Sequence, residues 1–370
     1  MAYLSSLTLH WVRVPLHEPF RISSGEISCR DSILVELRAG GRVGWGEAAP
    51  MPGQVYSSET PESTWEFLRA KLGPDFLGHP EFDPAGFFER MESLPGEPFA
   101  KAGLEGAVWD LRAQEASKPL WALLGGEGRG IASGAAIGLM PSLAALLERV
   151  ERFLAEGYRR IKIKIAPGHD VELVRAIRAK FGAIPLMVDA NAAYRIEDAE
   201  IFERLDEFGL MMIEQPLARQ ALQEHAELQR CLRTPICLDE SAESLESLAE
   251  IIRLGSAKII NIKVQRLGGL WPARLAHDAA RAAGLACWLG TMPELGIASA
   301  QGLHLATLPG FTLPTDVEAS ARWYGDDLIV PPIEVAPDGS ILLPDGPGMG
   351  YRVDPEKVAR YRVRQEEFRP

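Results

Sequence analysis

Five charged residues recur at a nearly constant spacing in the middle of the sequence. Lys164, Asp189, Glu214, Asp239 and Lys263 are separated by 25, 25, 25 and 24 positions. Each lies at or near the end of a short apolar stretch. A single carboxylate or lysine at such a place is usually a helix cap or a solvated group. Five of them at one spacing indicate instead a repeated unit that brings charged side chains together.

The three acids of this set suit a metal ion. Carboxylates that converge repel one another unless a cation neutralises them. Oxygen ligands with no His or Cys close by favour a hard cation. We therefore expect one Mg²⁺ per site, with Mn²⁺ as the alternative, held by Asp189, Glu214 and Asp239.

The two lysines would face each other across that ion. The cation and the opposing ammonium should favour a neutral amine, which lowers the pKa of a lysine toward that of a useful base. A substrate carboxylate at the metal would gain a second negative charge when its α-proton leaves, and the metal and the other lysine would stabilise it. We expect Lys164 and Lys263 to be catalytic. Lys162 shares a strand face with Lys164 in the stretch IKIKI and would support the site by pairing with a carboxylate of the protein or with that of the substrate.

The elements that carry these residues alternate between strand and helix from about residue 132. Such alternation predicts parallel strands joined by helices, and seven or eight units favour a closed barrel over an open sheet. The repeated residues would then lie at matching heights near the C-terminal mouth of the barrel. The strand-like stretches are 135–139, 160–165, 185–191, 210–216, 234–241, 259–265 and 286–294, and helical ones include 142–157, 170–182 and 196–209.

The first hundred residues read differently. Strand-like stretches at 7–16, 32–40 and 41–50 suggest an antiparallel meander, and helical stretches at 57–72 and 100–117 follow. This part is α+β. After about residue 314 regularity fades, and we expect the tail with ILLPDGPGMG to pack back against the first part.

Composition excludes several classes of protein. The chain has 370 residues and a net charge of −12, which argues against a surface that binds nucleic acid. No apolar run reaches the roughly 20 residues needed to cross a bilayer, and no leader peptide is visible. The four cysteines are scattered without metal-ligand spacing, which favours reduced thiols in a cytoplasmic protein.

These motifs resemble the enolase superfamily, in its lysine–lysine subgroup typified by muconate cycloisomerase. The resemblance covers nearly the whole chain and rests on YRRIKIKI, VDAN, IEQPL, CLDES and INIKVQRLGG. It implies an α/β fold, a modified (β/α)8 TIM-type barrel with an α+β capping domain formed by the N-terminal region and the C-terminal tail. It also implies an acid/base role for Lys164 and Lys263 and Mg²⁺ ligation by the three acids. We place the cap at 1–125, the barrel at 126–320 and the returning segment at 321–370.

Within the subgroup the chain looks most like the o-succinylbenzoate synthase/N-acylamino acid racemase branch. The resemblance implies dehydration of a cyclohexadiene carboxylate in menaquinone synthesis, racemisation of N-succinyl or other N-acyl amino acids, or both. In dehydration Lys164 would be both base and acid, with Lys263 as an electrostatic partner. In racemisation the two lysines would act from opposite faces. Arg266 falls where the branch carries an arginine near the second lysine.

Other residues of the expected site follow from the same resemblance. Supporting positions are Lys162, Asn191, Glu240, Arg266, Met292 and Glu294, and the substrate loops contribute Ser23, Ser24 and Tyr56. A capping role is the alternative for Asn191 and Glu240, and a surface-loop position is the alternative for Tyr56. The stretch GTMPELGIASA departs from the branch at Pro293, Leu295 and Ser299, which puts the substrate in question.

Three alternatives remain. A dipeptide epimerase would carry a DxD after the last strand to hold the substrate's ammonium, and MPELGIASA has none. A muconate-type cycloisomerase would use the same core residues. A non-catalytic barrel that binds carboxylates is the alternative from another class. The expected partner is a small carboxylate substrate, and the family habit suggests a homo-oligomer.

Overall fold

The computed structural model describes residues 4–22, 25–51, 57–78, 80, 82–128 and 130–370. Ser23, Ser24 and Tyr56, which the sequence placed in the substrate loops, lie outside the described residues. Their expected contacts with a substrate stay a prediction.

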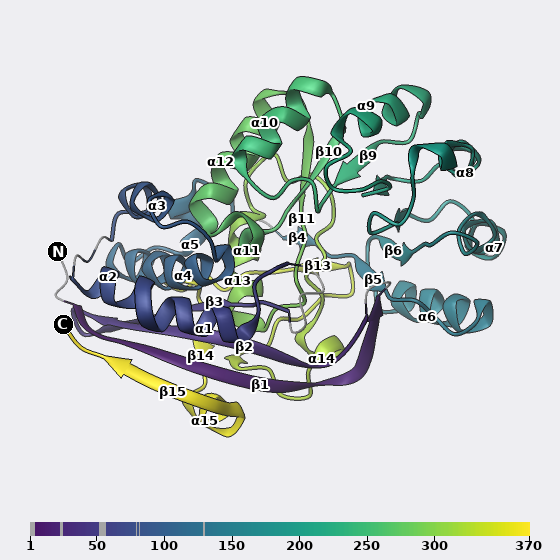
Figure 1. The fold of residues 1–370 in the computed structure, drawn as a ribbon. Coiled ribbons are helices and arrows are strands. Elements are labelled where there is room, and N and C mark those ends of the chain that lie inside the picture. Colours follow the sequence, from purple (N-terminus) through teal and green to yellow (C-terminus); the bar gives the residue numbers. More distant parts are fainter. Residues whose placement is uncertain (1–3, 23–24, 52–56, 79, 81, 129) are drawn as a thin grey trace.

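The N-terminal part forms a cap that lies beside the barrel (Figure 1). Four antiparallel strands in the order β15-β1-β2-β3 make its sheet. They are β1 (Leu4–Ile22), β2 (Gly25–Ala39), β3 (Arg42–Ala48) and β15 (Arg362–Phe368). The cap helices are α1 (Pro61–Phe67), the π-helical η2 (Leu68–Leu72), α2 (Gly73–Gly78), α3 (Pro84–Glu92) and α4 (Pro98–Glu115).

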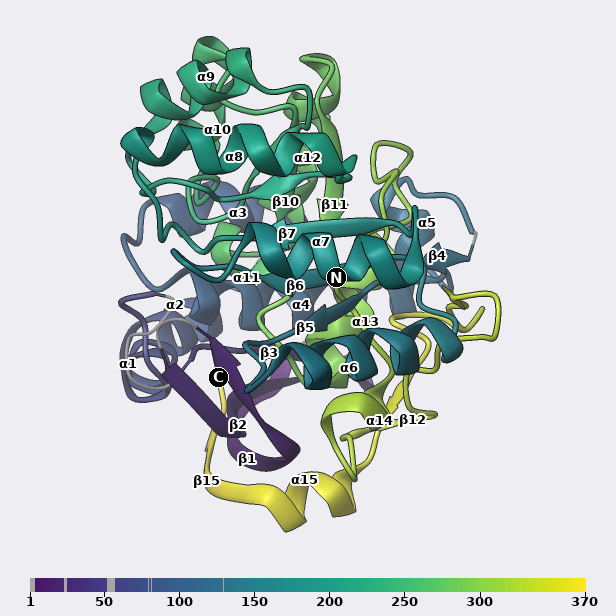
Figure 2. The ribbon, with the colours of Figure 1, turned by 90° about the vertical axis from the view of Figure 1, so that its right-hand side faces the viewer.

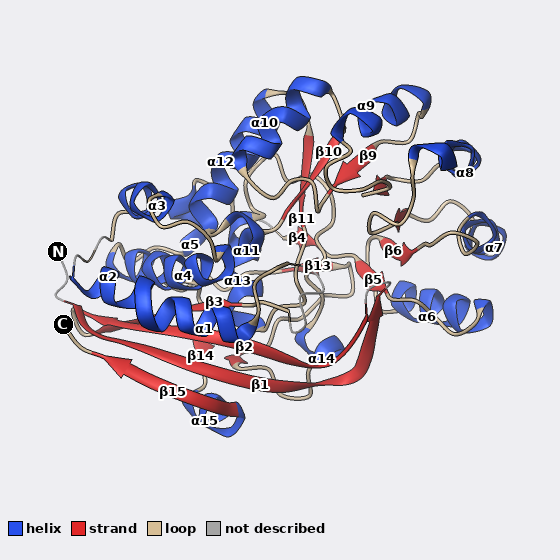
Figure 3. Cartoon of the chain, in the orientation of Figure 1, coloured by secondary structure: helices blue, strands red, loops and turns tan. Residues whose placement is uncertain are grey.

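The C-terminal tail returns to the cap, as predicted. Its last strand, β15, pairs with β1 from Val12↔Arg362 to Leu7↔Phe368. Figure 3 shows β15 as the outer strand of the sheet. The boundaries that we set at residues 125 and 320 stay a prediction.

The barrel contains the parallel strands that the alternating pattern predicted. Seven strands form one curled sheet: β5 (Ala135–Ile137), β6 (Ile161–Lys164), β7 (Leu186–Asp189), β8 (Ile213–Glu214), β9 (Ile236–Leu238), β10 (Ile259–Ile262) and β11 (Ala286–Leu289). Residues 311–316 join its two edges, through a bridge from Phe311 to Cys287 and another from Thr315 to Ser133. This irregular segment takes the place of an eighth strand.

Helices surround this sheet on its outer side (Figure 2). They are α6 (Leu143–Ala155), α7 (Val171–Phe181), α8 (Ala199–Leu205), α9 (Leu222–Cys231), α10 (Leu245–Leu254), α11 (Val264–Leu267), α12 (Leu270–Ala282) and α13 (Gly296–Leu305), with 3-10 turns η3 (Ile196–Asp198) and η4 (Asp206–Phe208). Helix α6 is typical: Ser142 caps it, and Leu146, Val150 and Phe153 are buried at helical spacing.

Short elements complete the chain. They are α5 (Leu120–Leu124), β4 (Ile131–Ala132), α14 (Ser320–Trp323), β12 (Ile329–Val330), β13 (Ser340–Ile341), β14 (Arg352–Val353) and α15 (Pro355–Tyr361). Among the described residues no helix is long and apolar enough to cross a membrane. All four cysteines are free thiols, as the scattered spacing predicted.

The cap and the barrel meet along helix α4, which is buried for most of its length. Strand β3 lies against α4 so closely that glycine is required on both sides. A Cβ on Gly46 would lie 1.9 Å from the carbonyl oxygen of Gly103, and a Cβ on Gly103 would lie 2.9 Å from Ala48. These contacts fix β3 to α4 and make the inner edge of the cap rigid.

Candidate active site

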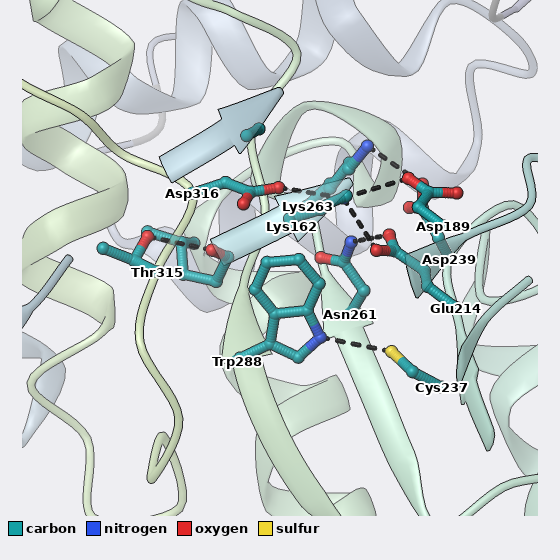
Figure 4. Close-up of polar contacts among 12 residues, drawn as sticks. Lys162, Asp189, Glu214, Cys237, Asp239, Asn261, Lys263, Trp288, Thr315 and Asp316 are labelled. Atoms are coloured by element: carbon teal, nitrogen blue, oxygen red, sulfur yellow. Dashed lines mark hydrogen bonds and ion pairs between the residues drawn. The ribbon is translucent and has the colours of Figure 1, made fainter. Parts of the chain in front are cut away.

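Lys162 lies at the centre of a buried cluster of carboxylates (Figure 4). Its Nζ is 2.7 Å from Glu214 Oε2, 3.1 Å from Asp189 Oδ2 and 3.1 Å from Asp316 Oδ2. Burial by itself would lower the pKa of Lys162, but these carboxylates outweigh it and raise that pKa well above its usual value. Lys162 is therefore a fixed positive charge paired with three carboxylates, and its support of catalysis stays a prediction.

Lys164 is held at the end of the same strand. Its Nζ donates to Asp189 Oδ2 and to Asn191 Oδ1, both at 2.7 Å. Asn191 is itself fixed, because its amide N–H donates to Asp189 Oδ1 and its Nδ2 donates to Glu240 Oε1. Asn191 has a left-handed backbone with φ of 42°, a conformation that costs free energy and is common at functional sites.

Lys263 lies on the other side of the acidic cluster. Its Nζ donates to Asp239 Oδ2 at 3.0 Å, and Arg266 Nη1 is 3.5 Å from Asp239 Oδ1. Burial opposes ionisation of Asp239, but Arg266 and Lys263 lower its pKa below the usual value. Each of the two lysines expected to be catalytic is thus bound to an aspartate at the end of a strand.

The repeated spacing corresponds to strand register only in part. Lys164 pairs with Asp189, and Asp189 pairs with Glu214, at one height. Glu214 then pairs with Cys237, so that Asp239 lies two residues further along. A shift of two residues keeps the side chain on the same face of a strand. The expected matching heights are therefore confirmed for the first three residues and displaced by two for Asp239.

Glu214 is buried among like charges. Its Oε1 accepts a hydrogen bond of 2.9 Å from Asn261 Nδ2. Burial and the neighbouring Asp189 raise the pKa of Glu214 to about 8. A cation bound beside Glu214 would favour the ionised carboxylate and lower this pKa again.

The inner wall beneath Lys162 is aromatic. The Lys162 ammonium lies 5.0 Å from the ring centroid of Trp288, and the Arg160 guanidinium lies 5.1 Å from the same ring. Trp288 Nε1 donates to Cys237 Sγ at 3.1 Å. Arg160 also donates to Asp316 Oδ1 at 2.7 Å. The indole thus supports both cations from below.

Several carboxylate oxygens in the site have incomplete partners. Glu214 Oε2, Asp239 Oδ1 and Glu240 Oε2 are buried without a hydrogen bond to the described part of the chain. Lys162 and Arg266 approach the first two as ion pairs only. No three acidic, imidazole or thiol side chains among the described residues stand ready to hold a metal ion, because lysine ammonium groups lie between the carboxylates. The oxygen-only donors and their incomplete partners nevertheless suit a hard cation.

The stretch 290–300 follows β11 and packs against the cap. Met292 is buried, and its N–H donates to Glu294 Oε1 at 2.9 Å. Burial raises the pKa of Glu294 to about 7.

Pro293, where the sequence departs from the expected motif, has an unusual φ of 23°. With Ser299 and Asp316 it lines a cavity of about 20 Å³. Leu295, the third departure, is fully buried, and its amide donates to the cap.

Sequence reasoning missed Asp316, Asn261 and Trp288. A signal existed for Asp316, which lies 53 positions after Lys263, about two further repeats. The expected DxD was sought at residues 292–300, whereas the segment that closes the barrel ends at Asp316. Residues 316–318 read Asp-Val-Glu, which is not DxD either, so the expectation against a dipeptide epimerase stays a prediction. Both acids have cationic neighbours already: Lys162 for Asp316, and Arg322 at 3.5 Å for Glu318.

Comparisons with known proteins agree with this architecture. Residues 5–125 match the family "Mandelate racemase / muconate lactonizing enzyme, N-terminal domain", and residues 145–358 match "Enolase C-terminal domain-like". An o-succinylbenzoate synthase of Geobacillus kaustophilus is 44% identical, covering 95% of this chain and 94% of the relative. An N-succinylamino acid racemase of an Amycolatopsis species is 42% identical, covering 95% and 96%. A solved enolase-superfamily structure from Listeria innocua superposes with a TM-score of 0.96 at 33% identity over 100% of both chains. The chain therefore belongs to the enolase superfamily, with both the N-terminal and the C-terminal domain of its mandelate racemase/muconate lactonizing enzyme members.

Proposed function

We propose that this protein is an Mg²⁺-dependent enzyme that removes a proton α to a carboxylate. It acts as an o-succinylbenzoate synthase, as an N-succinylamino acid racemase, or as both. The observation that carries the proposal is the pair of lysines, Lys164 and Lys263, each bound to a strand-end aspartate on either side of a buried acidic cluster. Relatives with both names, 42–44% identical over almost the whole chain, support it.

The two lysines have different parts in the two reactions. In dehydration Lys164 takes the α-proton and later protonates the leaving hydroxyl, while Lys263 stabilises negative charge. In racemisation one lysine removes the α-proton from one face, and the other lysine delivers a proton to the opposite face. Asn191 orients Lys164, because its Oδ1 accepts a hydrogen bond from the Lys164 ammonium.

Asp189, Glu214 and Asp239 would hold the metal ion. The ion supplies positive charge for the substrate carboxylate, which becomes more negative as the α-proton leaves. For the ion to bind, the Lys162 and Lys164 ammonium groups must withdraw from Asp189 and Glu214. Asp316 remains as a partner for Lys162 when this happens.

The balance of charge favours a substrate with two carboxylates. With every carboxyl ionised, as a bound cation would favour, five acids and five bases meet here: Asp189, Glu214, Asp239, Glu240 and Asp316 against Arg160, Lys162, Lys164, Lys263 and Arg266. A divalent cation would add two positive charges. N-succinyl amino acids and o-succinylbenzoate each carry two carboxylates, which would restore the balance.

The test is formation of o-succinylbenzoate, followed by ultraviolet absorbance, with Mg²⁺ and with EDTA. Exchange of the α-proton of N-succinyl amino acids in D₂O is measured in parallel. We expect metal-dependent turnover that Lys164→Ala abolishes and that Lys180→Ala, at an exposed lysine of α7, leaves unchanged. No turnover of either substrate by the intact protein would contradict the proposal. If α-proton exchange were seen only with dipeptides, the proposed activity would instead be that of a dipeptide epimerase.

A further inference from the structure

Gln265 connects the barrel to the cap by its side chain. It is only 2% exposed. Its Nε2 donates to the carbonyl oxygen of Glu47 at 2.8 Å, and its Oε1 accepts from the N–H of Ala49 at 3.0 Å. Both partners are backbone groups at the end of β3. The side-chain amide of Gln265 therefore pairs with the end of β3 as the backbone of a neighbouring strand would.

Gln265 lies in the short turn that follows Lys263. Helix α11 is a single turn, Val264–Leu267, and Lys263 is the residue at its N-terminal boundary. The N–H of Leu267 closes the turn on the carbonyl oxygen of Lys263 at 3.2 Å. The pairing of β10 with β11 holds the backbone up to Ile262. Because one turn has so few internal hydrogen bonds, the outside anchor at Gln265 then helps to fix where the backbone of Lys263 continues.

The anchor itself is rigid. Strand β3 is fixed to α4 by the glycine contacts of Gly46 and Gly103. The carboxylate of Glu47 is fully buried and accepts hydrogen bonds from the amides of Leu295 and Ala298, each at 2.9 Å. The same end of β3 thus holds both the turn of Lys263 and the start of α13.

Lys164 is held in a different way. Its strand β6 lies between β5 and β7, so that its backbone is paired on both sides. Its ammonium is oriented by Asp189 and Asn191, which also belong to the barrel. Asp189 and Asn191 hold Lys164 from the barrel, whereas Gln265 holds the turn of Lys263 to the cap as well.

We propose that Gln265 is a positioning residue that holds Lys263 from the cap and has no part in holding Lys164. The inference rests on the proposed proton chemistry. Racemisation, in which Lys263 transfers a proton, then depends on Gln265 more than dehydration does, because in dehydration Lys263 only stabilises negative charge. Gln265 thereby favours racemisation relative to dehydration.

The test uses Gln265→Met, which keeps the length of the side chain and removes both hydrogen bonds. Racemisation rates in the two directions must fall together, because the equilibrium constant between enantiomers is one. Exchange of the α-proton in D₂O has no such constraint, since each enantiomer presents its proton to one lysine. We expect exchange to fall roughly tenfold or more for one enantiomer only, as a small misplacement of a reacting group can cost that much.

A matched control is Gln301→Met. Gln301 is a buried glutamine of α13 whose Nε2 donates to the carbonyl oxygens of Trp45 in β3 and Gly106 in α4, at 2.7 and 3.0 Å. Its loss weakens the same interface without touching the turn of Lys263. We expect Gln301→Met to lower the melting temperature while leaving the ratio of the two exchange rates unchanged.

The outcomes separate the two proposals. A wild-type protein that exchanges neither enantiomer contradicts the proposed function. A wild-type protein that exchanges both, together with a Gln265→Met variant whose two rates fall equally, overturns the inference. Equal shifts of the ratio in the Gln265→Met and Gln301→Met variants overturn it as well, since the effect would then be a general loosening of the cap. Synthase activity is expected to fall less than exchange of the affected enantiomer.

Discussion

Asp316 holds the ammonium of Lys162 from one side, at 3.1 Å, while Asp189 and Glu214 hold it from the other (Figure 4). The contact with Asp316 is a hydrogen bond, whereas those with Asp189 and Glu214 are ion pairs. The same Asp316 also binds Arg160. It is therefore the carboxylate that fixes the inner end of the acidic cluster.

Asp316→Asn should lower the free energy of unfolding by about 3 kcal/mol. The change leaves the buried Arg160 with one negative charge fewer, and breaking a buried ion pair by removing one partner is costly. Urea unfolding measures the effect. Asp345→Asn, at an exposed aspartate, is the control and should stay within about 0.5 kcal/mol of wild type. Equal stabilities of the two variants would contradict the role given to Asp316.

Stability should fall as the pH rises through the range in which Glu105 ionises. Burial raises the pKa of Glu105 to about 7 from its ordinary value near 4.5, although the amides of Trp271 and Leu270 donate to it. Between these two pKa values Glu105 is ionised in the unfolded chain and neutral in the folded one. The stabilisation that this difference gives the folded state is therefore complete below pH 4.5 and is lost as the pH rises from 4.5 to 7.

Glu105→Gln provides the measurement, because it removes this titration and leaves all others. The difference in unfolding free energy between wild type and variant should shrink from pH 5 to pH 7.5, by up to about 3 kcal/mol. A difference that stays constant over this range would show that Glu105 is already ionised in the folded protein at pH 5.

Lys162→Met should make the protein more sensitive to Mg²⁺. In the absence of the ion, Lys162 neutralises Asp189 and Glu214, so its loss leaves these carboxylates to repel one another. Mg²⁺ would then raise the melting temperature of the variant more than that of wild type. Thermal unfolding with EDTA and with MgCl₂ measures both shifts. Equal shifts would place the ion away from these carboxylates.

Gly46→Ala should disrupt the docking of β3 on α4. The added methyl group would lie 1.9 Å from the backbone oxygen of Gly103, and backbone cannot move aside as a flexible side chain can. We expect a loss of more than about 2 kcal/mol. Gly41→Ala, where no atom lies within 4 Å of an added Cβ but φ is +76°, separates the cost of backbone strain from that of the clash.

The barrel and the core of the site could be predicted because their signals are local or periodic. Lys164, Asp189 and Glu214 each end an apolar strand, and a βα unit has a nearly fixed length, so equal spacing in sequence became proximity in space. The pairing of β15 with β1 was predicted only as a return of the tail, since nothing in the sequence specifies the register of strands so far apart.

The remaining partners depend on contacts that no local pattern encodes. Asp316 follows an irregular segment without strand-like alternation. Trp288 and Asn261 lie within recognisable strands, but a strand buried on both faces does not show which side chains point inward. The bonds from Gln265 to Glu47 and Ala49 join residues more than two hundred positions apart.

The pairing of Phe368 with Leu7 has a consequence for synthesis of the chain. Strand β15 leaves the ribosome after the whole barrel, so the long strand β1 waits with one edge open while the rest of the protein is made. An open edge of this length is a template for pairing with other nascent chains. Chains that terminate before β15 should therefore aggregate through the cap rather than accumulate as folded barrels.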